Sequence, residues 1–230
     1  MRRVARRLVV VTGAAGGIGA ALVERFRSAG DEVVAAGRDS CDVTDEQSVA
    51  AFFGGLGPVD VLVNNAGVSH SAPTHRTTLA DWQRQLDVNA TGAFLCTRAV
   101  LPGMRSRDHG RIVTVASTAA LTGAPYIAAY TAAKHAAVGL MRAVAAELAG
   151  TGVTANAVCP TFVRTPMTDR TVATIARTTG RDATAATEAL RASTPLGRLL
   201  EPAEVAHAVL FLAAPESGAI NGQCLTLNGG

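Results

Sequence analysis

The chain alternates between short runs of apolar, β-branched residues and longer amphipathic stretches along its whole length. The runs show no polar alternation, which is typical of strands buried on both faces of a sheet. Because parallel strands need crossover connections, the pattern predicts a doubly wound α/β fold with ligands above the carboxyl ends of the strands. The expected strands are Leu8–Val11, Glu32–Ala36, Cys41–Val43, Val59–Val63, Arg111–Ala116, Val153–Val158 and Cys224–Leu227.

The amphipathic stretches between these runs are expected to form helices. Their expected positions are Gly17 to Ala29, a start near Thr44, Leu79–Met104, Tyr126–Ala149 and Pro202–Leu212. One connection does not fit this scheme, because the four residues between Ala36 and Cys41 are too few for a crossover helix. Either that helix is absent, or the strand at Cys41 is vestigial.

No internal repeat or linker divides the chain, so residues 1–230 are predicted to form a single domain. The polar, threonine-rich residues 166–200 are expected to form a lid over the substrate. Met167, Ile175 and Leu190 either line an apolar pocket there or pack the lid onto the body of the protein.

Composition excludes several classes of protein. With 48% hydrophobic and 17% charged residues, the chain can bury a large core, which excludes disorder. The run Leu8–Val11 is too short for a signal peptide or a membrane span, so we expect a cytoplasmic protein. The cysteines lie far apart without a CxxC pair, so reduced core thiols are expected rather than disulfides or metal ligands; they are Cys41, Cys96, Cys159 and Cys224.

Charge gives little support for a nucleic-acid partner. The formal net charge is +3, and four arginines crowd the start of the chain: Arg2, Arg3, Arg6 and Arg7. A nucleic-acid arm is one interpretation of this cluster. We favour a solvated N-terminus, because no basic face recurs downstream.

A glycine-rich turn, Thr12-Gly13-Ala14-Ala15-Gly16-Gly17-Ile18-Gly19, follows the first strand and opens a helix. Glycines allow a tight turn and a close approach of the backbone, and a helix N-terminus offers free N–H groups to pyrophosphate. Dinucleotide binding by Gly13, Gly17, Ile18 and Gly19 is therefore predicted, with a purely structural turn as the alternative.

Tyr130 and Lys134 lie one helical turn apart, so their side chains share a face. Lys134 is the only lysine of the chain and Tyr130 is one of two tyrosines, so a chance match is improbable. A phenol is a weak acid at neutral pH, and a nearby ammonium favours its ionised form. Tyr130 is predicted to exchange a proton with a carbonyl or alcohol oxygen.

Together with Asn64-Asn65-Ala66-Gly67, which follows the fourth expected strand, these two motifs resemble the short-chain dehydrogenase/reductase family. The resemblance covers Leu8 to Gly230 and implies a Rossmann-type fold. It implies that Asn65, Ala66 and Gly67 brace the sheet beside the adenosine.

The same resemblance assigns further contacts to the cofactor. It implies that Asp42 and Val43 contact the adenine and that Lys134 also holds the nicotinamide ribose. The alternative for Asp42 is an acid that only begins a helix. Val163 and Thr165 match the positions that hold the nicotinamide carboxamide, although the family usually has Pro-Gly where this chain has Pro160-Thr161.

Two more residues complete the expected catalytic group. Ser117 ends a strand thirteen residues before Tyr130, as in the family, and its hydroxyl can hydrogen-bond the reacting oxygen. Thr118 is a neighbouring competitor for this role. Asn89 matches the family's asparagine that kinks its helix and holds a water for a proton relay. His70 either faces the pocket or lies on a surface loop.

The end of the second strand selects the cofactor. An acid there bonds the ribose 2′-hydroxyl of NAD, whereas an arginine accommodates the 2′-phosphate of NADP. The chain has Gly37 and Arg38 at these positions, and a guanidinium suits a phosphate, so NADP is favoured. NAD stays open, because the shortened loop can bring Asp39 to the ribose instead.

The predicted activity is hydride transfer between NADP(H) and a ketone or secondary alcohol. Details such as STAALTG and AAYTAAKHAAVGL resemble ketoreductases acting on 3-oxoacyl thioesters and polyketides. The alternatives are an NAD-dependent secondary alcohol or 3-hydroxyacyl dehydrogenase and, more remotely, a non-catalytic dinucleotide-binding regulator. An enoyl reductase of this superfamily would show a longer Tyr-to-Lys spacing.

The helix at Tyr126–Ala149 is apolar on more than one side, which predicts a homo-oligomer. The resemblance implies that this helix and Leu79–Met104 pair with their symmetry mates, and that Pro202 to Leu227 forms a second interface. A tetramer uses both interfaces and a dimer only the first. The alternative is that the apolar face packs under the lid of the same chain.

Overall fold

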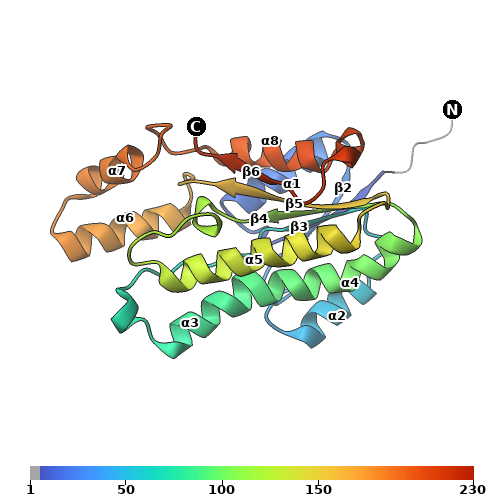
Figure 1. The fold of residues 1–230 in the computed structure, drawn as a ribbon, viewed down its shortest axis with the longest axis horizontal. Coiled ribbons are helices and arrows are strands. Elements are labelled where there is room, and N and C mark those ends of the chain that lie inside the picture. Colours follow the sequence, from blue (N-terminus) through green and yellow to red (C-terminus); the bar gives the residue numbers. More distant parts are fainter. Residues whose placement is uncertain (1–5) are drawn as a thin grey trace.

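The computed structural model describes residues 6–230, so Arg2 and Arg3 of the N-terminal cluster lie outside it. Its centre is a six-stranded parallel sheet in the order β2-β1-β3-β4-β5-β6 (Figure 1). The doubly wound α/β prediction is confirmed. The strands are β1 (Leu8–Thr12), β2 (Glu32–Ala36), β3 (Val61–Asn64), β4 (Gly110–Val115), β5 (Val153–Pro160) and β6 (Cys224–Leu227).

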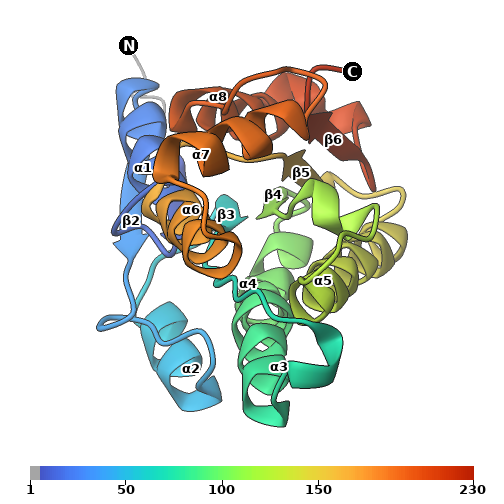
Figure 2. The same ribbon diagram turned by 90° about the vertical axis from the view of Figure 1, so that its left-hand side faces the viewer.

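Helices cover both faces of this sheet (Figure 1). On one face α1 and α8 pack against alternate strand residues such as Val9 and Val11, while Val10 faces α4 and α5 on the other. Figure 2 shows α6 and α7 in front of the sheet's carboxyl end. The helices are α1 (Ile18–Ser28), α2 (Glu46–Gly54), α3 (Leu79–Leu86), α4 (Gly92–Ser106), α5 (Ala128–Glu147), α6 (Pro166–Thr179), α7 (Ala183–Ala192) and α8 (Pro202–Leu212).

Strand order reverses between β1 and β3, which are hydrogen-bonded neighbours. The connections on either side of this point run to opposite faces, so their loops diverge above the carboxyl ends and leave a crevice for a ligand. The glycine-rich turn follows β1 and the Asn64–Gly67 turn follows β3, which places both at this crevice.

Residues 37–45, between β2 and α2, form neither a helix nor a strand, so the expected strand at Cys41–Val43 is wrong and α2 alone carries the chain from β2 to β3. The chain turns at once, since the Cys41 N–H donates to the Gly37 carbonyl at 2.9 Å. Cys41 and Val43 then pack their side chains into the core beneath α4. The Asn64–Gly67 turn therefore follows the third strand of the sheet, and β2 is left at the edge.

Two long helices differ from expectation. The one predicted over Leu79–Met104 is interrupted by a π-helical turn at Asp87–Thr91, which separates α3 from α4. The one predicted from Tyr126 begins at Ala128, because Tyr126 has a left-handed backbone with φ of 68°.

The structure also tests the expectations for the N-terminal arginines and for the cysteines. Arg7 is not freely solvated, since its guanidinium bonds the Asp31 carboxylate at 2.7 and 2.8 Å. All four cysteines are free; Cys224 is half-buried and the others are buried. Within residues 6–230, no helix is long and apolar enough to cross a membrane.

Candidate active site

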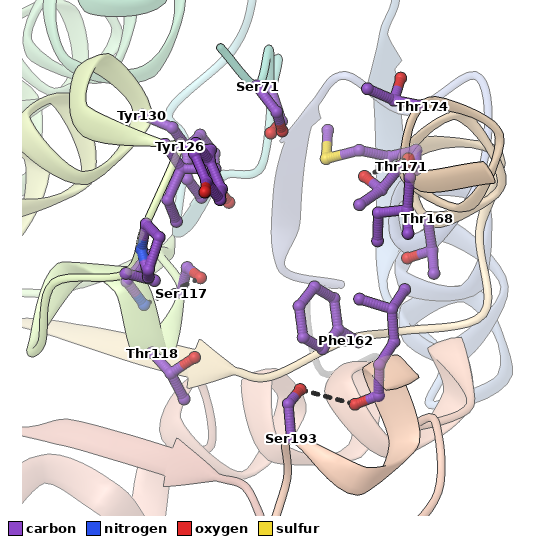
Figure 3. A pocket seen from close by; sticks show the side chains of 18 of the residues that line it. Ser71, Ser117, Thr118, Tyr126, Tyr130, Phe162, Thr168, Thr171, Thr174 and Ser193 are labelled. Carbon is purple, nitrogen blue, oxygen red and sulfur yellow. Dashed lines mark hydrogen bonds between the residues drawn. The ribbon is translucent and has the colours of Figure 1, made fainter. Parts of the chain in front are cut away.

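A cavity of about 840 Å³ opens at the carboxyl ends of the strands, beneath α6 and α7. Figure 3 shows Ser117, Thr118, Tyr126 and Tyr130 along one wall and the threonines of α6 along the other. Among the lining residues are three that the sequence placed in the lid: Met167, Ile175 and Leu190.

The glycine-rich turn adopts a conformation that requires its glycines. Gly13 has φ of 63°, and a Cβ there would lie 2.7 Å from the Ala66 Cα. Gly17 has φ of 54° and begins α1 without any side-chain cap, so no side chain blocks the N-terminus of this helix from an anion. The Gly19 N–H donates to the Gly16 carbonyl at 3.0 Å. Ile18 lines the cavity directly after this turn.

Asn65 ties this turn to β3. Its Nδ2 donates to the carbonyls of Thr12 and Gly13 at 2.9 and 3.0 Å, while the Thr12 hydroxyl accepts from the Asn65 and Ala66 N–H groups at 3.0 Å. Gly67 lies against the active-site side chains, since a Cβ there would be 2.9 Å from Asn89 Oδ1. The Asn64–Gly67 turn thus links the predicted cofactor loop to Asn89.

The loop after β2 presents Arg38 with little restraint. Its side chain is 85% exposed, and its Nε lies 3.6 Å from Asp42 Oδ2. Hydrogen bonds from Thr44, followed by the Arg38 cation, lower the pKa of Asp42. Asp39 is exposed and makes no ion pair within residues 6–230. Val43 packs its side chain beside Gly92, so it is buried in the core.

Lys134 and Tyr130 lie together, as their spacing on α5 predicts. The buried Lys134 Nζ lies 5.8 Å from the centre of the Tyr130 ring and donates to the Val115 carbonyl at 3.0 Å. Burial lowers the pKa of Lys134 to about 8. Burial also raises the pKa of Tyr130, an effect that a hydrogen bond with Ser117 only partly offsets. Tyr130 therefore keeps its proton at neutral pH, whereas the sequence argument expected its ionised form to be favoured.

Asn89 sits in the π-helical turn and is buried. Its Nδ2 donates to the Val68 and Gln85 carbonyls at 2.9 Å, and its Oδ1 accepts from the Val68 N–H at 3.2 Å. Gln85, one turn earlier, bonds the backbone N–H and carbonyl of His70 in the same way. The side-chain amides of Asn89 and Gln85 thus bond the backbone of alternate residues in the loop after Gly67, as a neighbouring β-strand does. Ser69 and Ser71 face the cavity, while His70 is exposed.

Val163 and Thr165 both line the cavity at the entry to α6. The Thr165 hydroxyl accepts from the Thr168 N–H at 3.4 Å and so begins this helix. Thr161, which stands where the family usually has glycine, donates its N–H to the Leu227 carbonyl at 3.0 Å. Its side chain is accommodated, since Thr161 also lines the cavity.

Sequence reasoning missed several cavity residues, because their positions depend on tertiary structure. Tyr126 and Phe162 come from loops and Arg76 from the short 3₁₀ helix Thr74–Arg76, and none of the three is itself part of a recognised motif. Gln85 carried one available signal, a polar residue four positions before Asn89. Within residues 6–230, no group of three His, Cys, Asp or Glu side chains gathers in a way that could hold a metal ion.

Comparison with known proteins agrees with this geometry. The family described as Enoyl-(Acyl carrier protein) reductase matches residues 38–230. An acetoacetyl-CoA reductase of Shinella zoogloeoides is 36% identical, with 97% of this chain and 98% of the relative covered. A protein named as a ketoacyl reductase of the monensin polyketide synthase of Streptomyces virginiae is 38% identical, over 97% of this chain and 96% of the relative.

A solved structure is similar over the same length. The crystal structure of a variant actinorhodin polyketide ketoreductase with NADPH superposes with a TM-score of 0.90 at 34% identity, covering 98% of this chain and 97% of that one. Each of these proteins covers at least 97% of this chain. The chain belongs to the short-chain dehydrogenase/reductase family.

Proposed function

We propose that the protein is an NADP(H)-dependent ketoreductase that acts on 3-oxoacyl thioesters or related polyketide intermediates. The observation that carries this proposal is Lys134, a buried cation beside the Tyr130 ring, with Ser117 on the same cavity wall. Relatives named acetoacetyl-CoA reductase and ketoacyl reductase support the substrate class.

The residues present fit a dinucleotide. Gly13 and Gly17 have left-handed backbones, and no atom lies within 4 Å of a Cβ built on Gly16, so the turn leaves room for a phosphate beside the uncapped N-terminus of α1. Asp42 would contact the adenine, Lys134 the nicotinamide ribose, and Val163 and Thr165 the carboxamide. The bound cofactor supplies a hydride.

Reduction of a ketone needs a hydride on carbon and a proton on oxygen. Tyr130 supplies the proton from its Oη, and its raised pKa suits this direction because the phenol stays protonated. The Ser117 hydroxyl hydrogen-bonds the same substrate oxygen and orients it. The Lys134 cation stabilises the phenolate that is left behind, and Asn89 holds the loop at Val68 beside this group.

Arg38 selects NADP in this proposal. Its side chain is 85% exposed and its Nε lies 3.6 Å from Asp42 Oδ2, so the guanidinium can turn to meet a 2′-phosphate. A phosphate binds a guanidinium through paired hydrogen bonds, which Asp42 at this distance does not match.

The test combines two substrates with two cofactors. Purified protein is mixed with acetoacetyl-CoA and NADPH or NADH, and loss of the reduced nicotinamide is followed by absorbance. We expect faster reduction with NADPH. Oxidation of 3-hydroxybutyryl-CoA with NAD in preference to both reductions would instead support the alternative dehydrogenase, and absence of turnover with every pair would contradict the proposal.

We further propose a cytoplasmic homotetramer in which residues 166–200 act as a substrate lid. Helices α4 and α5 lie side by side in Figure 1, and α4 exposes 42% of Phe94. The second interface would use α8, where Phe211 is 50% exposed, and the edge of β6. Light scattering should give about four times the 23.5 kDa chain mass, and a monomer would contradict both interfaces.

A further inference from the structure

Tyr126 is held in a backbone conformation that tyrosine rarely adopts. Its φ is 68°, and the only other non-glycine residue with positive φ within residues 6–230 is Asp108. In this region the Cβ crowds the following carbonyl, so a bulky side chain is strained there. Such an outlier in a well-defined fold motivates a hypothesis about function.

Packing does not account for this residue. The Tyr126 side chain is 65% exposed, and its phenol makes no hydrogen bond to any part of the chain that the structure describes. The turn itself is fixed through the backbone, because the Ala72 N–H donates to the Tyr126 carbonyl at 2.8 Å. A glycine would make the same bond without the strain, so the tyrosine ring does nothing that the fold requires.

The ring does, however, line the active-site cavity. Figure 3 shows Tyr126 on the same wall as Tyr130, with Phe162 towards the α6 side. Both tyrosines of the chain are thus cavity residues. An exposed aromatic ring in a concave site is typical of a ligand contact, since it offers a large flat apolar surface with few rotatable bonds.

We propose that Tyr126 determines substrate specificity by contacting the acyl group beyond the reacting carbonyl, and that it favours acyl groups carrying a flat ring. The proposal rests on the proposed ketoreductase function. The cavity of about 840 Å³ also takes in Val163 and Thr165, so the nicotinamide would fill part of it, while Tyr126 lines the wall that this proposal leaves to the acyl group. Aromatic rings attract one another through offset or edge contacts, which a methyl group cannot reproduce.

The test compares two thioesters that differ only at this position, benzoylacetyl- and acetoacetyl-N-acetylcysteamine. Tyr126→Gly removes both ring and strain, Tyr126→Phe keeps the ring, and Asp108→Gly changes the other left-handed residue, in the turn before β4. For each protein we measure kcat/KM with NADPH, Kd for both thioesters by calorimetry with NADP⁺ present, and the melting temperature.

Tyr126→Gly should lower the benzoylacetyl-to-acetoacetyl ratio of kcat/KM and of affinity by about tenfold, equivalent to about 1.4 kcal/mol, without lowering the melting temperature. Tyr126→Phe and Asp108→Gly should keep both ratios within about twofold of the wild type. The proposal is overturned if Tyr126→Gly leaves both ratios unchanged, or if Tyr126→Phe lowers them as much as Tyr126→Gly does. It is also overturned if Tyr126→Gly has a melting temperature well below that of the wild type.

The two readouts separate this proposal from the proposed function. A wild-type protein that binds the thioesters without reducing them contradicts the ketoreductase function, while the Kd ratios still decide the role of Tyr126. A wild-type protein that reduces both thioesters with no change of ratio in Tyr126→Gly contradicts only the role of Tyr126. Binding of neither thioester contradicts both.

Discussion

Replacing Lys134 by methionine should abolish activity and yet stabilise the folded protein at neutral pH. The side chain is 5% exposed, and burial lowers its pKa from the ordinary 10.5 to about 8. Folding therefore places a cation where it is less stable than in water. At pH 7 this difference corresponds to about 3 kcal/mol against the folded state.

Methionine has a side chain of similar length, so it can fill most of the buried space that the Lys134 side chain occupies without placing a charge there. It loses the hydrogen bond from Nζ to the Val115 carbonyl, worth about 1 kcal/mol net. The expected gain in the free energy of unfolding is then about 2 kcal/mol, or a melting temperature raised by roughly 4–8 °C for a chain of this size. Urea unfolding at pH 7 measures it.

The pH dependence of this gain follows from the same shift. Between pH 8 and 10.5 the unfolded lysine binds a proton that the folded one has released, so wild-type stability gains from this group as pH rises. The Lys134→Met protein lacks that rise. The gap in stability between the two proteins should be full below pH 8, close before pH 10.5 and reverse slightly there, because the bond from Nζ to the Val115 carbonyl then outweighs the remaining burial penalty. Arg170→Met, which removes an exposed cation of α6, should show no such gap.

Lys134 can also be observed directly. Because it is the only lysine, a sample with ¹³C-labelled lysine gives one Cε signal, and its titration midpoint should lie near pH 8. A midpoint near 10.5, or a Lys134→Met protein less stable than the wild type at pH 7, would refute the reasoning.

Three further substitutions test the rest of the site. Tyr130→Phe should lower kcat by about 10²–10⁴-fold with NADPH affinity nearly unchanged in a fluorescence titration, and a variant retaining more than a few per cent of kcat would contradict the acid role. Arg38→Asp should shift the kcat/KM ratio of NADPH to NADH at least about tenfold towards NADH; a wild type that already prefers NADH would point to Asp39 instead. Gln85→Leu removes the bonds to His70, so KM for acetoacetyl-CoA should rise severalfold while urea unfolding shifts by about 1–2 kcal/mol; an unchanged KM would show that the loop needs no such support.

The central strands β3, β4 and β5 could be predicted from the sequence because they are buried on both faces, which gives continuous apolar runs. The edge strands over Glu32–Ala36 and Cys224–Leu227 are only partly buried, yet both have the predicted bounds. The helix over Pro202–Leu212 was also predicted to the residue, since Pro202 and the capping Glu201 mark its start. The hydrophobic period alone cannot reveal a π-helical turn, so the interruption at Asp87–Thr91 was expected only through the resemblance at Asn89.

Some features of the site follow from sequence spacing alone, whereas others depend on tertiary structure. Tyr130 and Lys134 come together because they share one helix, and Gly13 is required by the close approach of Ala66. The lower pKa of Lys134 and the higher pKa of Tyr130 depend on burial under neighbouring elements, which spacing does not report. For the same reason Tyr126 could not be singled out from the sequence, because its left-handed backbone conformation is visible only in the structure.

The expected strand at Cys41–Val43 is absent, yet the cofactor crevice between β1 and β3 keeps its supporting strands. Strands are lost from a sheet at least cost at its edge, because an edge strand pairs with one neighbour while a central strand pairs with two. Here the edge is β2, which pairs only with β1. The crevice at β1 and β3 keeps every strand that supports it, and Ala14 still bonds the Ala36 carbonyl at 3.2 Å. The short segment instead shapes the loop that holds Arg38, the residue proposed to select the cofactor.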